Sequence, residues 1–163
     1  MLTGIFSPSK CAECKLCCNF HRSSAWETPA LEPELIFHLH ELCIPLIKRE
    51  DGTTSFYLDF KTDSSDEVAN CPMLDPNSGC MLPREMRPLE CRIWPVRLMK
   101  KSGTNVIGIY RNCAALNKQA FEELKSAVLN ELLPIILEYS RRCPQAIREY
   151  DPAYEIIWPE EKL

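Results

Sequence analysis

The stretch CAECKLCC at residues 11–18 places four cysteines within eight positions. Drawn as a helix at about 100° per residue, Cys11, Cys14, Cys17 and Cys18 fall within an arc of about 120°. One helix face cannot surround a metal ion, because tetrahedral coordination needs ligands from opposite sides. Either further ligands come from elsewhere, or the segment forms a turn that wraps around the ion. Adjacent cysteines point in different directions in most backbones, so Cys17 and Cys18 could serve two metals, or one metal and one redox role.

Cysteine is the outlying residue of the whole composition, with ten among 163 residues. Such a number indicates either disulfides in an oxidising compartment or metal ligands in a reducing one. Residues 1–10 (MLTGIFSPSK) have no basic start and no long apolar run, unlike a secretory signal peptide. No stretch approaches the roughly 20 apolar residues of a membrane span. We therefore expect a cytoplasmic protein without a membrane partner, and a disulfide-stapled protein is the weaker alternative.

Outside the cysteine segments, the sequence predicts a small single α+β domain with two short hairpins, C-terminal helices and a cysteine-rich, irregular metal-binding core. The Asp51-Gly52 pair is a turn signal within residues 46–60. Residues 96–111 predict a second hairpin, because β-forming residues flank a turn that contains glycine. Residues 61–70 are polar and predict a loop between the two.

Helices are expected on both sides of these hairpins. Residues 34–42 are mostly good or neutral helix formers, and Pro45 ends that segment. From Asn117 the chain carries apolar residues four positions apart, and Pro134 should kink or split the resulting helix. Residues 154–158 could return as a short strand. The apolar stripe consists of Ala120, Leu124, Val128 and Leu132.

The middle of the chain is rich in both cysteine and proline. Residues 71–95 contain five prolines, which forbid long regular elements, and metal ligation would hold such a segment together. We expect a metal-chelating region at residues 1–116 and a helical extension at 117–163 packed on the same domain. Cys43, at the end of an apolar helix, is expected to be a small core residue. The predicted metal ligands are Cys11, Cys14, Cys17, Cys18, Cys71, Cys80, Cys91 and Cys113.

The identity of the metal stays open at this level. Thiolates are soft ligands that suit zinc, copper(I) and iron–sulfur clusters. The first three cysteines match the spacing of a bacterial ferredoxin, but its fourth position is occupied by His21. That histidine could be a nitrogen ligand or a surface residue. Eight cysteines would fill two four-ligand sites or one larger cluster, so zinc, iron and a [4Fe–4S] cluster are all compatible.

Basic residues gather among the later cysteines. Residues 80–113 contain seven arginines and lysines and two glutamates, in a chain of net charge −4. Arginines near thiolates lower thiol pKa values and donate hydrogen bonds to sulfur. Arg87 and Arg92 are the best candidates for this role, and the alternative is that they only order the proline-rich loop through carbonyl or carboxylate contacts. The acidic balance argues against nucleic acid as a partner.

Four separated motifs follow one another in a characteristic order. They are the cysteines of residues 11–18, Cys71-Pro72, Gly79-Cys80, and the segment Arg87-Pro88-x-x-Cys91-Arg92-x-x-Pro95. This order resembles the CxxCxxCC family of zinc- or iron-chelating domains (YkgJ type) over roughly half the chain. The family often has an aliphatic–tyrosine pair after Gly-Cys, where this chain has Met81-Leu82. The resemblance implies metal binding by these cysteines and leaves the reaction unassigned.

Two classes of function follow. The first is a binding module that chelates zinc or iron, or carries an iron–sulfur cluster, with coordination saturated by cysteine. The second is a redox or group-transfer enzyme that uses an open coordination position or a spare thiolate such as Cys17 or Cys18. A similar cysteine-rich region occurs in flagellin lysine N-methylases, but the chain has no nucleotide-binding glycine motif. The lack of an acid–base or cosubstrate motif favours the binding module, and the surplus of cysteines favours the enzyme.

Overall fold

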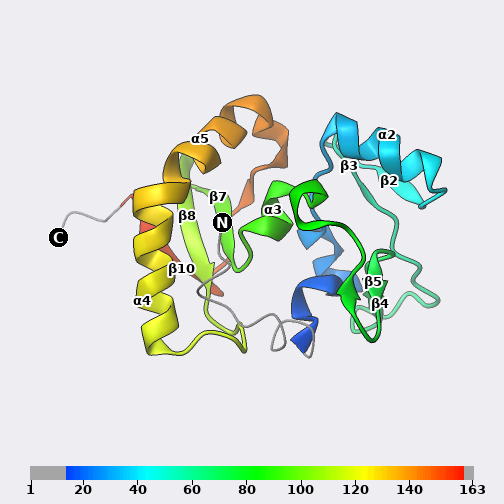
Figure 1. The fold of residues 1–163 in the computed structure, drawn as a ribbon, viewed down its shortest axis with the longest axis horizontal. Helices are drawn as coiled ribbons and strands as arrows, with labels where there is room; N and C mark the ends of the chain where they lie inside the picture. The colour runs from blue at the N-terminus through cyan, green and yellow to red at the C-terminus, as the bar shows by residue number, and fades with distance from the viewer. Residues whose placement is uncertain (1–13, 160–163) are drawn as a thin grey trace. The chain divides into compact units, whose positions relative to one another are not determined.

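The computed structural model describes residues 14–159 (Figure 1). The chain folds into two compact units, and the division between them falls between Arg92 and Ile93. Both units combine helices with small sheets, so the α+β prediction is confirmed. The second hairpin therefore belongs to the same unit as the C-terminal helices. The boundary between the units lies about 25 residues before the boundary that we expected near residue 117. Within the described residues, no helix has the length and apolar character needed to cross a membrane.

The first unit, residues 14–92, contains three antiparallel sheets of two strands each. Strand β1 pairs with β4, β2 with β3, and β5 with β6. The β2–β3 pair confirms the first predicted hairpin, with Gly52 in the left-handed region (φ 83°). The elements are η1 (Leu16–Cys18), β1 (Asn19–His21), η2 (Arg22–Glu27), α2 (Pro33–Glu41), β2 (Leu46–Lys48), β3 (Thr54–Phe56), β4 (Val68–Asn70), β5 (Leu74–Asp75), β6 (Gly79–Cys80), η3 (Arg84–Met86) and α3 (Leu89–Arg92).

Helix α2 ends in a Schellman motif. Cys43 adopts a left-handed conformation (φ 55°), and its N–H donates to the His40 carbonyl at 3.0 Å. The Ile44 N–H donates to the Leu39 carbonyl at 3.0 Å, and both of these side chains belong to one apolar cluster. Cys43 itself is exposed. The expectation that it is a core residue is therefore wrong, because the chain reverses at this position and turns the side chain outward.

The core of the first unit includes part of the cysteine set. Cys71 is buried, with 9% of its surface exposed, among apolar side chains from α2, β3 and the segments beside β4 and β5. Cys18 and Cys80 are partly buried and pack against the same cluster. The buried members of this cluster are Phe20, Leu31, Leu35, Leu39, Phe56, Leu58, Ala69, Cys71, Met73 and Leu82.

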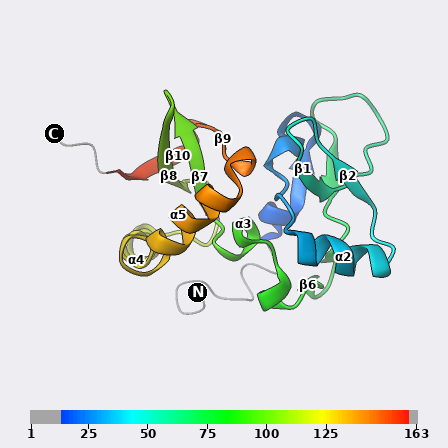
Figure 2. The same cartoon turned by 90° about the horizontal axis from the view of Figure 1, so that it is seen from above.

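The second unit, residues 93–159, is built around one four-stranded sheet of order β10-β8-β7-β9. Strands β7 and β9 are parallel, and the other two pairings are antiparallel. Helices α4 and α5 lie along one face of this sheet, as two views at right angles show (Figures 1 and 2). The elements are β7 (Val96–Lys101), β8 (Thr104–Tyr110), α4 (Lys118–Ala127), the π-helix η4 (Val128–Leu132), α5 (Leu133–Arg142), η5 (Pro144–Ala146), β9 (Arg148–Glu149) and β10 (Tyr154–Trp158).

The helical segment of the second unit follows its predicted pattern. The Asn117 side chain caps α4 by accepting the Ala120 N–H at 2.8 Å. All four residues of the apolar stripe are buried. Pro134 is the second residue of α5, and the π-helix η4 lies directly before it and separates α5 from α4. The predicted split near Leu133 and the predicted C-terminal strand are both confirmed.

Candidate metal centre

The described part of the CAECKLCC segment, residues 14–18, is not a continuous helix. Lys15 adopts a left-handed conformation (φ 51°, ψ 12°), which a continuous helix does not allow. The single 3-10 turn η1 then carries Cys17 and Cys18, and β1 begins at Asn19. Residues 15–18 therefore form a tight turn, and its wrapping around an ion stays a prediction. Cys14 lies half-buried just before Lys15, and Cys11 lies outside the described residues.

The sulfur atoms of Cys17 and Cys18 lie 3.9 Å apart. The expectation that these adjacent side chains point in different directions is therefore wrong. Consecutive side chains alternate sides in a strand, but in a 3-10 turn they diverge by only about 120°. Because the chain leaves η1 directly after Cys18, the two thiols remain on the same side of the turn and in contact.

Strand pairing brings Cys71 and Cys80 into the same region of the first unit. Asn19 pairs with Asn70 in the β1–β4 ladder, and the Cys71 N–H donates to the Cys18 carbonyl at 2.8 Å. Cys80 pairs with Leu74 in the β5–β6 ladder. The Leu74 N–H donates to the Cys71 carbonyl at 2.9 Å, so the two ladders are joined at Cys71.

Cys91 joins this group from the short helix α3. Two glutamates fix that helix: Glu32 accepts the Leu89 N–H at 3.2 Å, and Glu90 accepts the Ala30 N–H at 2.7 Å. The pKa of Cys91 is raised well above its ordinary value of 9.0 by burial of the thiol and then by the charges of Cys17 and Cys71. The residue as a whole nevertheless keeps exposed surface.

The pKa values of two other thiols show the same mutual influence. Burial raises the pKa of Cys71 to about 12, with smaller contributions from the charges of Cys80 and Cys17. The pKa of Cys17 is also raised, first by its hydrogen bond with Cys18, then by burial and by the charge of Cys18. These thiols are protonated at neutral pH in the metal-free protein, and a metal ion that binds them displaces protons. We call Cys17, Cys18, Cys71, Cys80 and Cys91 the thiol cluster.

Arg87 is attached to the thiol cluster in two ways. Its Nε donates to the Leu82 carbonyl at 3.0 Å, and an Nη donates to the Cys80 carbonyl at 3.4 Å. Its positive charge lowers the pKa of Cys17 against the stronger opposing effects. The two carbonyl contacts order the proline-rich loop, and the role of Arg87 toward thiolates that bind metal stays a prediction. The Nε of Arg92 is buried and has no hydrogen-bond partner within residues 14–159.

His21 and Cys113 are two further candidate ligands from the sequence. His21 is exposed, and its Nδ1 is 3.2 Å from the Asp66 carbonyl, which favours the surface interpretation. Cys113 belongs to the second unit, where its carbonyl accepts the Leu116 N–H at 2.9 Å. The nine described cysteines form no disulfide with one another. Among residues 14–159, no three cysteine, histidine or acidic side chains are already arranged to hold a metal ion.

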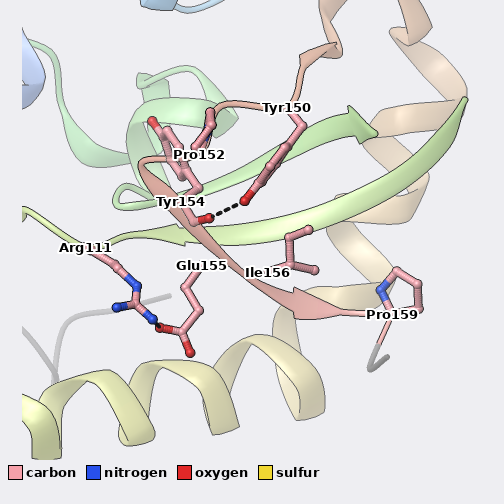
Figure 3. Close-up of a pocket in the computed structure, with 7 residues that line it drawn as sticks. All are labelled: Arg111, Tyr150, Pro152, Tyr154, Glu155, Ile156 and Pro159. Carbon is pink, nitrogen blue, oxygen red and sulfur yellow. Dashed lines mark hydrogen bonds and ion pairs between the residues drawn. The ribbon is translucent and has the colours of Figure 1, made fainter. Parts of the chain in front are cut away.

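A separate cavity of about 480 Å³ lies beside β10 in the second unit (Figure 3). Its volume is in the range of small-molecule sites, but its polar groups are engaged with one another. Arg111 forms an ion pair with Glu155, and the Tyr150 hydroxyl donates to the Tyr154 carbonyl at 3.1 Å. None of the predicted site residues lines it, and no sequence motif pointed to it. The lining residues are Arg111, Tyr150, Pro152, Tyr154, Glu155, Ile156 and Pro159.

The thiol cluster is the stronger candidate site of the two. It joins cysteines from four separate sequence segments, attaches them to a hydrophobic core, and places an arginine among them. Its thiols act on one another electrostatically, which residues scattered over a surface do not. No family model, curated protein or solved structure matches this chain.

Proposed function

We propose that this chain is a metal-binding protein that chelates zinc or iron through the thiol cluster. The observation that carries the proposal is that Cys18, Cys71 and Cys80, which come from distant parts of the sequence, pack on one hydrophobic core, where the Cys71 N–H donates to the Cys18 carbonyl at 2.8 Å. Several thiols gathered on one core provide the soft ligands that zinc and iron–sulfur clusters prefer. A reducing, cytoplasmic environment would keep them reduced and available to bind metal.

The energetics of the metal-free cluster support this function. Burial and neighbouring charge both disfavour the thiolate form at Cys17 and Cys71. A bound cation reverses that preference, because it neutralises the thiolates and replaces their protons. The surrounding segment has little structure of its own, since β5 and β6 contain two residues each. Metal binding would supply the free energy that such short elements cannot supply alone.

The resemblance to CxxCxxCC domains agrees with the proposal, residue by residue. The family's Cys71-Pro72, Gly79-Cys80 and Arg87-to-Pro95 motifs include three cysteines of the thiol cluster and Arg87. In this structure Arg87 reaches the carbonyl of Cys80, so two of the motifs are in direct contact. The proposed metal is zinc or iron, and a [4Fe–4S] cluster is the form that iron could take.

A redox or group-transfer enzyme is the second candidate function. The exposed surface of the residue Cys91 favours it, because a ligand at the surface of the thiol cluster could leave a coordination position open to a substrate. This alternative requires that metal-loaded protein keeps one reactive thiol or binds an exchangeable ligand. Alkylation of metal-loaded protein that labels Cys91 and no other member of the thiol cluster would support it.

The proposal is tested by elemental analysis and an optical spectrum of protein purified without oxygen. Stoichiometric zinc in colourless protein, or iron with a visible absorption band, supports metal binding, and acid-labile sulfide identifies an iron–sulfur cluster. The variant Cys71→Ser should lose metal, whereas the matched control Cys43→Ser should keep it, because Cys43 is exposed at the end of α2. Wild-type protein that neither retains nor takes up zinc or iron would exclude the proposed function.

A further inference from the structure

The orientation of Cys17 and Cys18 is fixed by the backbone on both sides of them. The left-handed Lys15 begins the 3-10 turn, and the Cys18 N–H closes it by donating to the Lys15 carbonyl at 2.9 Å. On the other side, the Cys18 carbonyl accepts the Cys71 N–H at 2.8 Å, which ties the end of the turn to the β1–β4 ladder. The backbone that carries the two thiols is thus fixed by interactions that do not depend on metal.

The distance between the sulfurs matches two ligands of a single ion. Two thiolates bound to one tetrahedral zinc ion at about 2.3 Å lie about 3.8 Å apart. The observed separation is 3.9 Å. In a [4Fe–4S] cluster each cysteine ligates its own iron, so sulfurs on neighbouring irons point outward from different corners and lie farther apart. The pair as it stands fits one ion and does not fit two corners of a cluster.

The surroundings of the pair supply the charge balance and further ligands for that ion. Two thiolates in contact repel each other, and a divalent cation between them removes this repulsion. Arg87 is close enough to Cys17 to stabilise its negative charge. Cys71 is the next candidate ligand, because its N–H donates to the Cys18 carbonyl at 2.8 Å and both residues pack on the same core.

We infer that Cys17 and Cys18 bind the same metal ion, as a chelate of two adjacent thiolates, and that this ion is mononuclear. The inference rests on the proposed function and refines it. It assigns both adjacent cysteines to one task, where the sequence alone left two metals, or a metal and a redox role, open. It also predicts that the chain binds thiophilic divalent ions, such as zinc and cadmium, without inorganic sulfide.

Trypsin should release Cys17 and Cys18 together on residues 16–22 (LCCNFHR), which contain no other cysteine. Wild-type protein is titrated anaerobically with cadmium, and a sample is alkylated and digested at each step. Mass spectrometry then gives the number of alkyl labels on each peptide. If both thiols bind one ion, the peptide passes from two labels to none as metal is added, without a singly labelled form. The peptide of residues 23–48 carries the exposed Cys43 and should stay labelled throughout, which makes it the internal control.

A peptide that is mainly singly labelled at intermediate cadmium would overturn the inference and leave metal binding intact. Purification of the native protein with a [4Fe–4S] cluster would do the same. A different result, in which cadmium and zinc protect none of the cysteines and the protein takes up no iron, would remove the proposed function itself. Because this experiment uses the wild-type chain, a variant that fails to fold cannot confuse the outcome.

As a second measurement, the variants Cys17→Ser, Cys18→Ser and the double variant are loaded with cobalt(II). One shared ion predicts that each single variant loses the same equivalent of tightly bound cobalt and that the double variant loses no more. Separate ions predict that the double variant loses two equivalents, which contradicts the inference. Circular dichroism of the metal-free proteins shows whether each variant retains the fold.

Discussion

Removal of the Cys71 thiol should reduce the loss of stability of the metal-free protein at alkaline pH. The pKa of Cys71 is raised from 9.0 to about 12 in the folded protein, chiefly by burial. A raised pKa stabilises the fold fully below pH 9, and this contribution is lost as pH rises toward 12, because only the unfolded chain releases the proton. Between pH 8 and pH 10, the raised pKa of Cys71 therefore lowers the free energy of unfolding by about 1.4 kcal/mol.

The assay is urea unfolding of wild type and Cys71→Ala at pH 8 and pH 10, with a chelator and a reductant present. Alanine at this buried position lowers stability at both pH values, so the quantity compared is the change between them. The wild type should lose about 1.4 kcal/mol more than the variant over this interval. The control Cys43→Ala, at an exposed site, should lose as much as the wild type. Equal losses in wild type and Cys71→Ala would refute the argument that burial holds this thiol protonated.

Three further predictions concern other parts of the structure. Cys43→Gly should stabilise the metal-free protein by about 0.5–1 kcal/mol, because glycine adopts the left-handed conformation without strain, and a lower urea midpoint would contradict the assigned cap. Gly108→Ala should destabilise the second unit by about 1–3 kcal/mol, since a Cβ there would lie 2.9 Å from the fixed Tyr154 Cβ, and an unchanged thermal midpoint would show that β10 can shift. Arg87→Gln should weaken metal binding about 10–100-fold in a chelator competition, and Arg87→Lys should be intermediate, because only arginine supplies both the charge and the two carbonyl contacts. Equal metal affinity in all three proteins would show that Arg87 has no influence on the bound metal.

Elements that depend on local signals could be predicted from the sequence. The β2–β3 hairpin follows from the Asp51-Gly52 turn, and helix α4 follows from the four-residue apolar spacing and the Asn117 cap. The split of the C-terminal helix follows from Pro134, which cannot donate within a helix. Each of these signals acts within a few residues, so no knowledge of the tertiary structure was needed to interpret it.

Features that depend on distant contacts could not be predicted in this way. Strand β4 lies within residues 61–70, which are polar and predicted a loop, and it forms because β1 provides a partner almost 50 residues earlier. The contact between Cys17 and Cys18 depends on a left-handed lysine, a conformation that lysine rarely adopts and that its identity does not signal. The cavity beside β10 also escaped prediction, because its lining comes from Arg111 and residues 150–159, which share no motif.

The way the thiol cluster is assembled explains why metal and fold should depend on each other. Backbone ladders bring Cys18, Cys71 and Cys80 together, but these ladders are only two or three residues long and constrain the backbone more than the sulfur positions. Among the described residues, the sulfurs are consequently gathered without being arranged for coordination. Only Cys17 and Cys18 already have the separation of two ligands on one ion. A metal captured by this pair would then draw in the other thiols through changes of side-chain rotamer. The adjacent cysteines would therefore be the starting point of the site, and the other thiols would complete it.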